Sequence, residues 1–388
     1  MPLLPLRRVL VVLLLALVAR SAPAQTRDDP RATRVESSLI PIRGDASQPQ
    51  TILERLKHYK IAGASVAVID GGKIAWARGY GLADKEENRP VTPETLFQAG
   101  SISKPVAAIG TMKLVQEGRL NLEEDVNRKL ISWKVPENEF TKEKPVTLQR
   151  VLSHTAGLTV HGFPGYAEDK PVPTVPQILS GEKPANTSAV RVTVLPGKMW
   201  RYSGGGFTLM QLLVMDVTGK PYADFLRENV LDPAGMKDST YQQPLPVDRA
   251  AAAATGYRMN GAKVVGRYHT YPEQAAAGLW TTPSDLARLA IAFHDAWTGK
   301  SEKLLKQETA RQMLTKQHVG PCGLGWFLQG KGPTLRFLHN GRNEGFDCLL
   351  TYCTATGQGV VVMVNGNSNP NFMREIELVV AKEYGWPK

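Results

Sequence analysis

The order of β-type and helical segments along this 388-residue chain most constrains its fold. Residues 65–70 and 73–78 are β-type runs, and the Gly71-Gly72 pair between them is typical of a hairpin turn. Short apolar runs bounded by Gly, Pro or Asn return in the last third, at residues 323–329, 334–338, 346–352 and 360–364. Because early and late strands can join one antiparallel sheet, we expect the part between them to be an insertion.

Helical spacing of apolar residues dominates the middle of the chain. It predicts helices over residues 107–116, 148–152, 209–217 and 283–297, the last with Ser284 or Asp285 at its start. Residues 160–196 are rich in Pro and Gly, which predicts a long surface excursion. Two further helices, over residues 51–59 and 371–384, are expected beside the sheet.

These patterns predict an α+β fold, with an antiparallel β-sheet flanked by N- and C-terminal helices and a mainly helical insertion domain. We expect the sheet domain over residues 49–104 and 315–388, and the helical domain over residues 105–314. A cleft between two such units is a natural ligand site, so the active site is expected at their interface.

The first 24 residues have the features of a cleavable secretory signal peptide. Arg7 and Arg8 precede an unbroken apolar run over residues 9–19, which is too short to span a bilayer. Small residues place the cleavage after Ala24, ahead of a flexible lead-in over residues 25–48. We expect a periplasmic or secreted protein with no stable membrane insertion after cleavage. The alternative is an uncleaved membrane anchor.

The charge of the chain argues against one class of partner. The formal net charge is +11, but the Lys and Arg residues are scattered along the chain. A nucleic-acid role needs a concentrated basic footprint, so no nucleic-acid partner is expected.

Three cysteines occur, Cys322, Cys348 and Cys353. An oxidising compartment would allow one disulfide, but burial as small apolar residues is the favoured interpretation. No metal pattern such as His-Glu-x-x-His or clustered Cys and His occurs, so neither a metal nor another cofactor is expected. The lone His154 is interpreted as structural, because metal sites need several convergent ligands.

Ser101 and Lys104 form a Ser-x-x-Lys pair at the start of a predicted helix. Residues i and i+3 share a helix face, so the lysine amine can reach the serine hydroxyl. A serine becomes an effective nucleophile when a base removes its proton, and a lysine with a lowered pKa can be that base. A helix N-terminus also directs N–H groups at developing negative charge. The alternative is an exposed helix start with a capping serine and a solvated lysine.

A second candidate is Tyr202, which stands shortly before three consecutive glycines that begin at Gly204. Glycines let backbone approach closely, as an active-site rim requires. Tyr202 is a candidate proton carrier if a nearby cation lowers its pKa. The alternative is a buried tyrosine ahead of a flexible turn.

A third candidate segment begins at His339 and follows a predicted strand. Gly341 on an edge strand would let a substrate lie against the sheet. The backbone N–H of Arg342 can join that of Ser101 around an oxyanion. The alternative is a packed or capping histidine.

The three segments, in this order, resemble the motifs of the serine β-lactamase and penicillin-binding protein superfamily, in its class C β-lactamase-like branch. That branch has Ser-x-x-Lys, Tyr-x-Asn, and Lys-Thr-Gly or His-x-Gly. Three further phrases resemble it: Leu152-Ser-His-Thr-Ala-Gly-Leu158, Thr218-Gly-Lys-Pro-Tyr222 with Leu231-Asp-Pro-Ala-Gly-Met236, and Gly278-Leu-Trp-Thr-Thr-Pro-Ser284. The branch includes class C β-lactamases, DD-peptidases, D-aminopeptidases and family VIII carboxylesterases.

The resemblance implies that Ser101 is the acylated nucleophile and that Lys104 is the base that activates it. It implies that Tyr202 shares the proton transfers and that His339 orients substrate and tunes Tyr202. The oxyanion would lie between the backbone amides of Ser101 and Arg342.

One position departs from the family pattern, because Gly204 stands where the family usually has the Asn of its second motif. The resemblance implies that this Asn holds the amide of the substrate's acyl side chain. Its loss argues against strong β-lactamase activity and favours esters or another amide class. A side chain of Arg342 that faced the cleft would pair with a substrate carboxylate, and an exposed rim position is the alternative.

Two function classes follow. The first is an exported serine hydrolase that forms an acyl-enzyme on Ser101 and cleaves an ester or amide in a small-molecule or peptide substrate, as a carboxylesterase, a D-amino-acid peptidase or a β-lactamase does. The second is a non-hydrolytic penicillin-binding or sensor module, which Gly204 favours. No Gly-x-Ser-x-Gly elbow occurs, which argues against an α/β-hydrolase. The sequence does not specify an oligomeric state.

Overall fold

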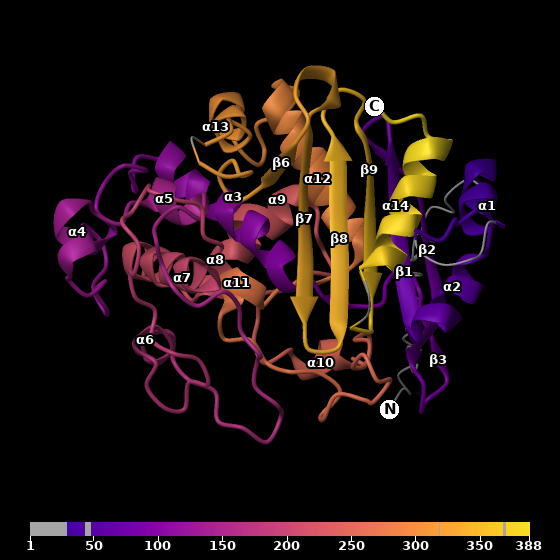
Figure 1. The fold of residues 1–388 in the computed structure, drawn as a ribbon, viewed down its shortest axis with the longest axis horizontal. Helices are drawn as coiled ribbons and strands as arrows, with labels where there is room; N and C mark the ends of the chain where they lie inside the picture. The colour runs from indigo at the N-terminus through magenta and orange to yellow at the C-terminus, as the bar shows by residue number, and fades with distance from the viewer. Residues whose placement is uncertain (1–28, 43–47, 318, 368–369) are drawn as a thin grey trace, which may run out of the picture.

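The computed structural model describes residues 29–42, 48–317, 319–367 and 370–388, so the predicted signal peptide lies outside the described residues. These residues form an α+β fold around a seven-stranded antiparallel sheet in the order β3-β2-β1-β9-β8-β7-β6 (Figure 1). The predicted fold class is therefore confirmed. The strands are β1 (Gly63–Asp70), β2 (Lys73–Asp84), β3 (Arg89–Pro90), β6 (Phe327–Gln329), β7 (Arg336–Asn343), β8 (Phe346–Cys353) and β9 (Gln358–Val364).

The sheet joins the two ends of the chain. β1 pairs with β2 across the Gly71-Gly72 turn, and on its other side it pairs with β9, where Ala64 lies opposite Val364. Side chains alternate between the two faces of a strand. Val66 therefore packs in the smaller core and Ala67 in the larger one, so β1 is buried on both faces.

Helices α1 (Pro30–Glu36), α2 (Ile52–Tyr59) and α14 (Asn371–Glu383) enclose the smaller core (Figure 1). The α2 helix begins at a capping box in which the Thr51 side chain and Glu54 exchange hydrogen bonds with each other's backbone. The α1 helix falls within the predicted flexible lead-in. Asp29 caps its start, and its buried Val35 packs in the smaller core, so this part of the lead-in is a docked helix instead.

The opposite face of the sheet packs on α12 (Pro283–Thr298). The side chain of Thr282 accepts a hydrogen bond from the Asp285 N–H and so caps this helix. The helix predicted over residues 283–297 therefore begins where it was expected, and Ser284 and Asp285 both lie in its first turn, while the cap is Thr282. Thr before Pro is a recognised helix-start signal, because proline is preorganised for the first helical position.

The middle of the chain is mainly helical, and none of the described helices is long and apolar enough to cross a membrane. Its helices are α3 (Ser103–Gln116), α4 (Glu139–Glu143), α5 (Leu148–Leu152), α6 (Val175–Ser180), α7 (Gly204–Thr218), α8 (Tyr222–Leu226), α9 (Asp232–Ala234), α10 (Val247–Ala250), α11 (Gln274–Ala277) and α13 (Gln307–Met313). The remaining elements are three 3-10 helices, one π-helix and a two-stranded ribbon. The 3-10 helices are η1 (Gly100–Ile102), η2 (Val126–Arg128) and η4 (Gly332–Thr334), the π-helix is η3 (Arg227–Leu231), and the ribbon is formed by β4 (Phe97–Gln98) and β5 (Trp280–Thr281).

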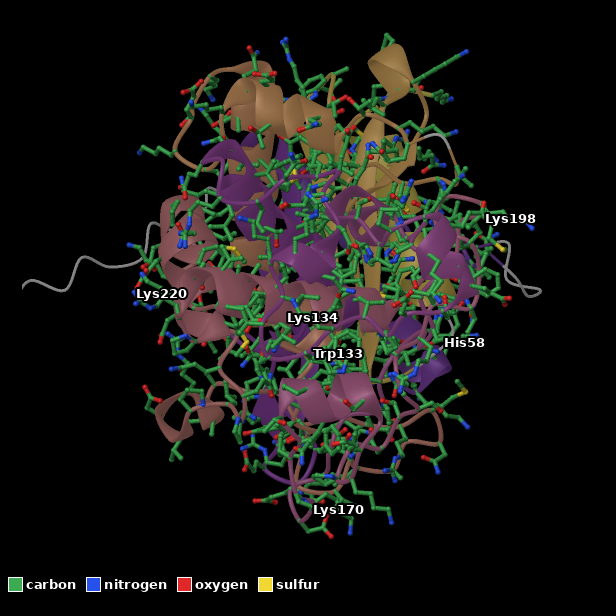
Figure 2. The ribbon with its side chains drawn as sticks, turned by 90° about the vertical axis from the view of Figure 1, so that its left-hand side faces the viewer. His58, Trp133, Lys134, Lys170, Lys198 and Lys220 are labelled. Atoms are coloured by element: carbon green, nitrogen blue, oxygen red, sulfur yellow. The ribbon has the colours of Figure 1, made fainter. Side chains whose placement is uncertain are left out.

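The predicted surface excursion over residues 160–196 is only partly at the surface. Lys170 is exposed near one end of the molecule (Figure 2). In contrast, Ile178 and Leu179 of α6 are buried, because the helix packs against α7. The excursion therefore forms part of the helical unit.

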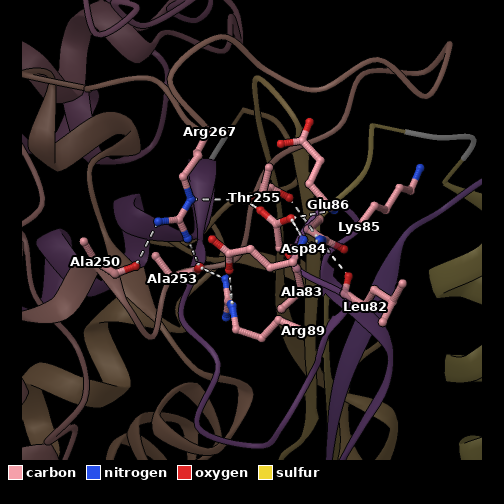
Figure 3. A network of polar contacts seen from close by, with 12 residues as sticks. Leu82, Ala83, Asp84, Lys85, Glu86, Arg89, Ala250, Ala253, Thr255 and Arg267 are labelled. Atoms are coloured by element: carbon pink, nitrogen blue, oxygen red, sulfur yellow. Dashed lines mark hydrogen bonds and ion pairs between the residues drawn. The ribbon is translucent and has the colours of Figure 1, made fainter.

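A polar network ties the end of β2 to the helical unit (Figure 3). Arg267 and Arg89 both donate to the carbonyl oxygen of Ala253, each at 2.7 Å. Arg267 also donates to the Thr255 hydroxyl, which in turn contacts the buried carboxylate of Asp84. Hydrogen bonds to charged groups are stronger than neutral ones, so this network holds the end of β2 against the helical unit.

The three cysteines are all buried and form no disulfide. Cys348 on β8 donates to the carbonyl oxygen of Ala99 at 2.7 Å, and Cys322 accepts from the Trp200 indole at 3.3 Å. Their favoured interpretation as small buried residues is confirmed.

Candidate active site

Ser101 and Lys104 lie where the turn η1 passes into helix α3. Lys104 Nζ is 2.9 Å from Ser101 Oγ and 2.7 Å from the carbonyl oxygen of Ala276 on α11. Gly100, just before the serine, has a φ of 50°, a left-handed conformation that glycine adopts without strain. The spacing that the sequence displays thus becomes a direct hydrogen bond between the two side chains.

Burial gives Lys104 the properties of a base. Its side chain is 1% exposed, and burial lowers its pKa to about 7. No carboxylate among the described residues pairs with it, and its other neighbours include the rings of Tyr202 and Phe207, with centroids 5.1 and 5.9 Å away. A buried cation without a counter-ion favours its neutral form, so a large share of the amine is unprotonated near pH 7.

Tyr202 lies beside this pair, at the entry to α7. Its ring stacks on His154 at 4.3 Å, and Phe327 lies parallel to it at 6.3 Å. Burial raises the pKa of Tyr202, while a hydrogen bond to Ser101 acts in the opposite direction. The condition set in the sequence analysis, that a nearby cation lowers the pKa of Tyr202, is not met, because burial dominates. The phenol stays protonated at neutral pH and is placed to donate a proton.

The third predicted segment lies within β7 rather than after a strand. β6 pairs only with residues 336–338, so beyond Leu338 this side of β7 has no partner strand among the described residues. His339 is buried on this open edge, and its Nδ1 donates to the Asn340 carbonyl at 2.6 Å. Burial and the charge of Lys104 lower the pKa of His339 to about 3, so its ring is neutral.

Two glycines let the open edge of β7 approach η1, the segment that carries Ser101. A Cβ on Gly341 would overlap the carbonyl oxygen of Ala99 and come 2.5 Å from Cys348 Sγ. A Cβ on Gly100 would lie 2.5 Å from the backbone nitrogen of Arg342. The Arg342 amide is therefore adjacent to the residue that precedes Ser101, as an oxyanion pair requires.

The side chain of Arg342 takes the rim position that the sequence analysis gives as an alternative. Its guanidinium makes a bidentate pair with the buried Asp347 carboxylate, at 2.6 and 2.7 Å, and is 54% exposed. The Asp347 carboxylate raises the pKa of Arg342 further. A substrate carboxylate would have to share this arginine with Asp347.

Ser101, Tyr202, His339 and Arg342 all line one pocket, which has a volume of about 460 Å³. Its polar lining includes Ser101, His161, Tyr202, His339, Asn340, Arg342 and Asp347, and its apolar lining includes Trp200, Phe327, Pro370 and Met373. The described residues contain no group of three or more His, Cys, Asp or Glu that would hold a metal ion. A serine in the lining of a pocket, beside an amine with a lowered pKa, is suited to acyl transfer.

Comparison with known families agrees with this geometry. The Beta-lactamase family model matches residues 49–383, which include the three motif segments. The chain belongs to the beta-lactamase family. The resemblance seen in the sequence is thereby confirmed.

Within this family the relatives are distant. Protein flp of Staphylococcus aureus strain MW2 is 24% identical over 331 residues, which are 83% of this chain and 63% of that protein. The octameric penicillin-binding protein homologue from Pyrococcus abyssi has a TM-score of 0.70 and 25% identity, covering 86% of this chain and 76% of that one. D-alanine carboxypeptidase AmpC from Burkholderia cenocepacia, at 20% identity, shares the fold with a TM-score of 0.68 and coverage of 85% and 97%.

Gly204 stands where the motif of the beta-lactamase family has Asn, and in this protein the backbone of a neighbouring segment packs closely against it. The Gly204 N–H donates to the carbonyl oxygen of His161 at 3.0 Å, and a Cβ on Gly204 would lie 3.0 Å from that oxygen. The segment around His161 thus lies against the position where the family has an Asn side chain.

Two histidines lie beside Tyr202, of which the sequence analysis missed His161 and interpreted His154 as structural. His161 lines the pocket, and its ring centroid lies 4.8 Å from that of Tyr202. His154 accepts a hydrogen bond from the Ser203 N–H on Nδ1 at 3.1 Å, and burial keeps its pKa well below the usual value. The sequence carries no local signal for the placement of His161, because it depends on packing against the start of α7.

Proposed function

We propose that this protein is a serine hydrolase that acylates Ser101 with the acyl group of an ester or amide. The observation that carries the proposal is the 2.9 Å contact between Ser101 Oγ and Lys104 Nζ, together with the burial that lowers the lysine pKa to about 7. A hydroxyl next to a neutral amine loses its proton as it attacks a carbonyl carbon.

The proposed cycle has two halves. First, neutral Lys104 takes the Ser101 proton while Oγ attacks the carbonyl carbon, and the amides of Ser101 and Arg342 stabilise the oxyanion. The tetrahedral intermediate then collapses, and the leaving alcohol or amine receives a proton through Tyr202, which Lys104 resupplies. In the second half, water attacks the acyl carbonyl carbon and gives a proton to Lys104; the bond from the acyl carbon to Ser101 Oγ then breaks, Oγ takes that proton, and the acid is released.

We infer a substrate with an apolar acyl part, because Trp200, Phe327 and Met373 form much of the pocket wall. Peptidase-like and esterase-like activities rank close together, and an efficient β-lactamase ranks behind them. Gly204 supports this order, because it offers no side-chain amide for the acyl group of a β-lactam. The penicillin-binding and D-alanine carboxypeptidase names of the structural relatives are in keeping with a small or peptide-like substrate.

We further propose that the protein works outside the cytoplasm, in the periplasm or secreted. The support is the sequence of its first 24 residues, with Arg7 and Arg8 ahead of an apolar run and small residues before the proposed cleavage after Ala24.

The test is intact-mass spectrometry of the protein after brief exposure to a fluorescent penicillin and, separately, to p-nitrophenyl acetate, with released product followed in parallel. The expected result is an adduct on Ser101 with steady product release, faster for the ester. No adduct and no product with either compound would overturn the proposal.

A second candidate is a module that binds penicillin or a related acyl donor without hydrolysing it. Gly204 favours this candidate. It removes the Asn amide of the family motif two residues after Tyr202, and backbone packs against the position instead. In the same experiment, a stable adduct on Ser101 without product release would favour the module over the hydrolase.

A further inference from the structure

His161 is a polar side chain of the pocket wall whose hydrogen-bonding capacity is unused. The His339 ring donates to the Asn340 carbonyl, and Arg342 is held by Asp347. The ring nitrogens of His161, by contrast, make no hydrogen bond to any residue in the described ranges, and its side chain is exposed. Its only ring contact there is with Tyr202.

The backbone holds His161 in this position. Its carbonyl oxygen accepts from the Gly204 N–H, and the carbonyl oxygen of Val160 accepts from the Gly205 N–H, both at 3.0 Å. Val160 has a φ of 61°, which is an outlier for a β-branched residue. Such strain persists only where surrounding contacts impose it, and it concentrates at functional sites.

The approach of this segment depends on the two glycines. A Cβ on Gly205 would come 2.8 Å from the carbonyl oxygen of Thr159, and one on Gly204 would meet Phe163 at 3.1 Å as well as the His161 carbonyl. Glycines at both positions therefore let residues 159–163 lie directly on the first turn of α7. This close packing brings an imidazole to the pocket wall next to Tyr202.

The position of the ring indicates what it recognises. Its centroid is 4.8 Å from the Tyr202 ring, and His161 lines the same pocket as Ser101, so it borders the space that an acyl group on Ser101 would occupy. An imidazole keeps at least one N–H in both of its protonation states, so it can always donate to an acceptor oxygen.

We propose that His161 determines specificity by donating a hydrogen bond to a second carbonyl oxygen on the acyl chain of the substrate. The preferred substrates are then esters or amides whose acyl group carries an oxo or amido oxygen within a few bonds of the reacting carbonyl. This inference rests on the proposed acylation of Ser101. A hydrogen bond of ordinary strength predicts a preference of about five- to tenfold.

The experiment compares two p-nitrophenyl esters of equal chain length, the 4-oxopentanoate and the pentanoate, which differ by a carbonyl in place of a methylene. The readout is the kcat/KM for the 4-oxopentanoate divided by the kcat/KM for the pentanoate, each corrected for spontaneous hydrolysis. His161→Ala is expected to lower this ratio about five- to tenfold. His161→Gln, which keeps an N–H donor, is expected to retain more of it.

His58→Ala is the matched control. His58 is an exposed histidine on α2, away from the pocket, and its ring centroid also lies 4.8 Å from a tyrosine ring, that of Tyr59 (Figure 2). Its loss should not change the ratio. An unchanged ratio in His161→Ala, or an equal loss in the Ala and Gln variants, would overturn the inference while the hydrolase stands. A protein that hydrolyses neither ester and forms no Ser101 adduct would overturn the proposed function itself.

Discussion

Lys104 Nζ lies 2.9 Å from Ser101 Oγ, and its second contact is a neutral carbonyl oxygen, that of Ala276, at 2.7 Å. Neither contact carries a negative charge, so nothing compensates the cost of burying a protonated amine. The site therefore holds its base in the unprotonated form at a pH where an exposed lysine would be fully charged.

The rate of acylation is expected to rise with pH and to level off above a midpoint of about 7, because only neutral Lys104 accepts the serine proton. A pH profile of kcat/KM with a p-nitrophenyl ester measures this midpoint. Lys104→Arg should be inactive across the profile, because an arginine does not lose its proton. A flat wild-type profile between about pH 6 and 9 would contradict the role of Lys104.

Substitution by alanine should have different effects at Ser101 and at Ser103. Ser101→Ala is expected to abolish acylation with little change in Tm. Ser103 donates to the Gly100 carbonyl and accepts from the Leu279 N–H, so Ser103→Ala should still be acylated but lose about 1–3 kcal/mol of stability. Intact-mass labelling and thermal unfolding separate the two effects, and comparable labelling of both variants would argue against Ser101 as nucleophile.

Gly341→Ala is expected to lower both acylation and stability. Its Cβ would overlap the carbonyl oxygen of Ala99, so β7 must move away from η1 and take the Arg342 amide with it. Overpacking of this kind costs about 1–3 kcal/mol. Gly206→Ala is the control, because the nearest atom to its Cβ, on Leu158, is 3.4 Å away and alanine favours a helix. Equal acylation rates and Tm values in the two variants would argue against the close approach.

Gly204→Asn is expected to raise the rate of β-lactam acylation, because it supplies the amide that the family motif has. The same change crowds the His161 carbonyl, which must shift by a few tenths of an ångström, so Tm should fall. Gly204→Ala introduces the crowding without the amide. Rates of penicillin labelling in the two variants separate the effects, and equal rates would mean that the amide has no role.

Glu273 should make stability depend on pH. Its carboxylate is fully buried without a hydrogen-bond partner among the described residues, and burial raises its pKa to about 8. Between its ordinary pKa and about 8 the folded protein keeps a proton that the unfolded chain releases, so stability falls as pH rises through this range. Glu273→Gln should match the wild-type Tm near pH 5 and exceed it near pH 8, and an equal difference at both would contradict this assignment.

Local patterns were sufficient for much of the fold. The Gly71-Gly72 pair predicts the β1–β2 hairpin, and apolar spacing predicts α2, α12 and α14, because these signals act between residues close in sequence. The cap at Thr282 was missed although it is also local. The docked helix α1 was missed for a different reason, since its stability comes from α14, at the other end of the chain.

In the site, too, some features follow from local sequence and others depend on distant segments. The Ser101–Lys104 contact follows from helical spacing, so sequence alone can predict it. The high pKa of Tyr202 and the position of His161 cannot be read from neighbours in sequence. Both depend on which distant segments enclose them, and Val160 even adopts a backbone conformation that its residue type disfavours.

The pairing of β1 with β9, which sets Ala64 against Val364, has a consequence for when activity appears. The turn that carries Ser101 is made early in synthesis, but Arg342 on β7 follows 241 residues later, and β9 later still. A growing or truncated chain therefore carries Ser101 and Lys104 without a working site. Such long-range pairing is slow to form, so we expect the site to be complete only after the sheet has closed.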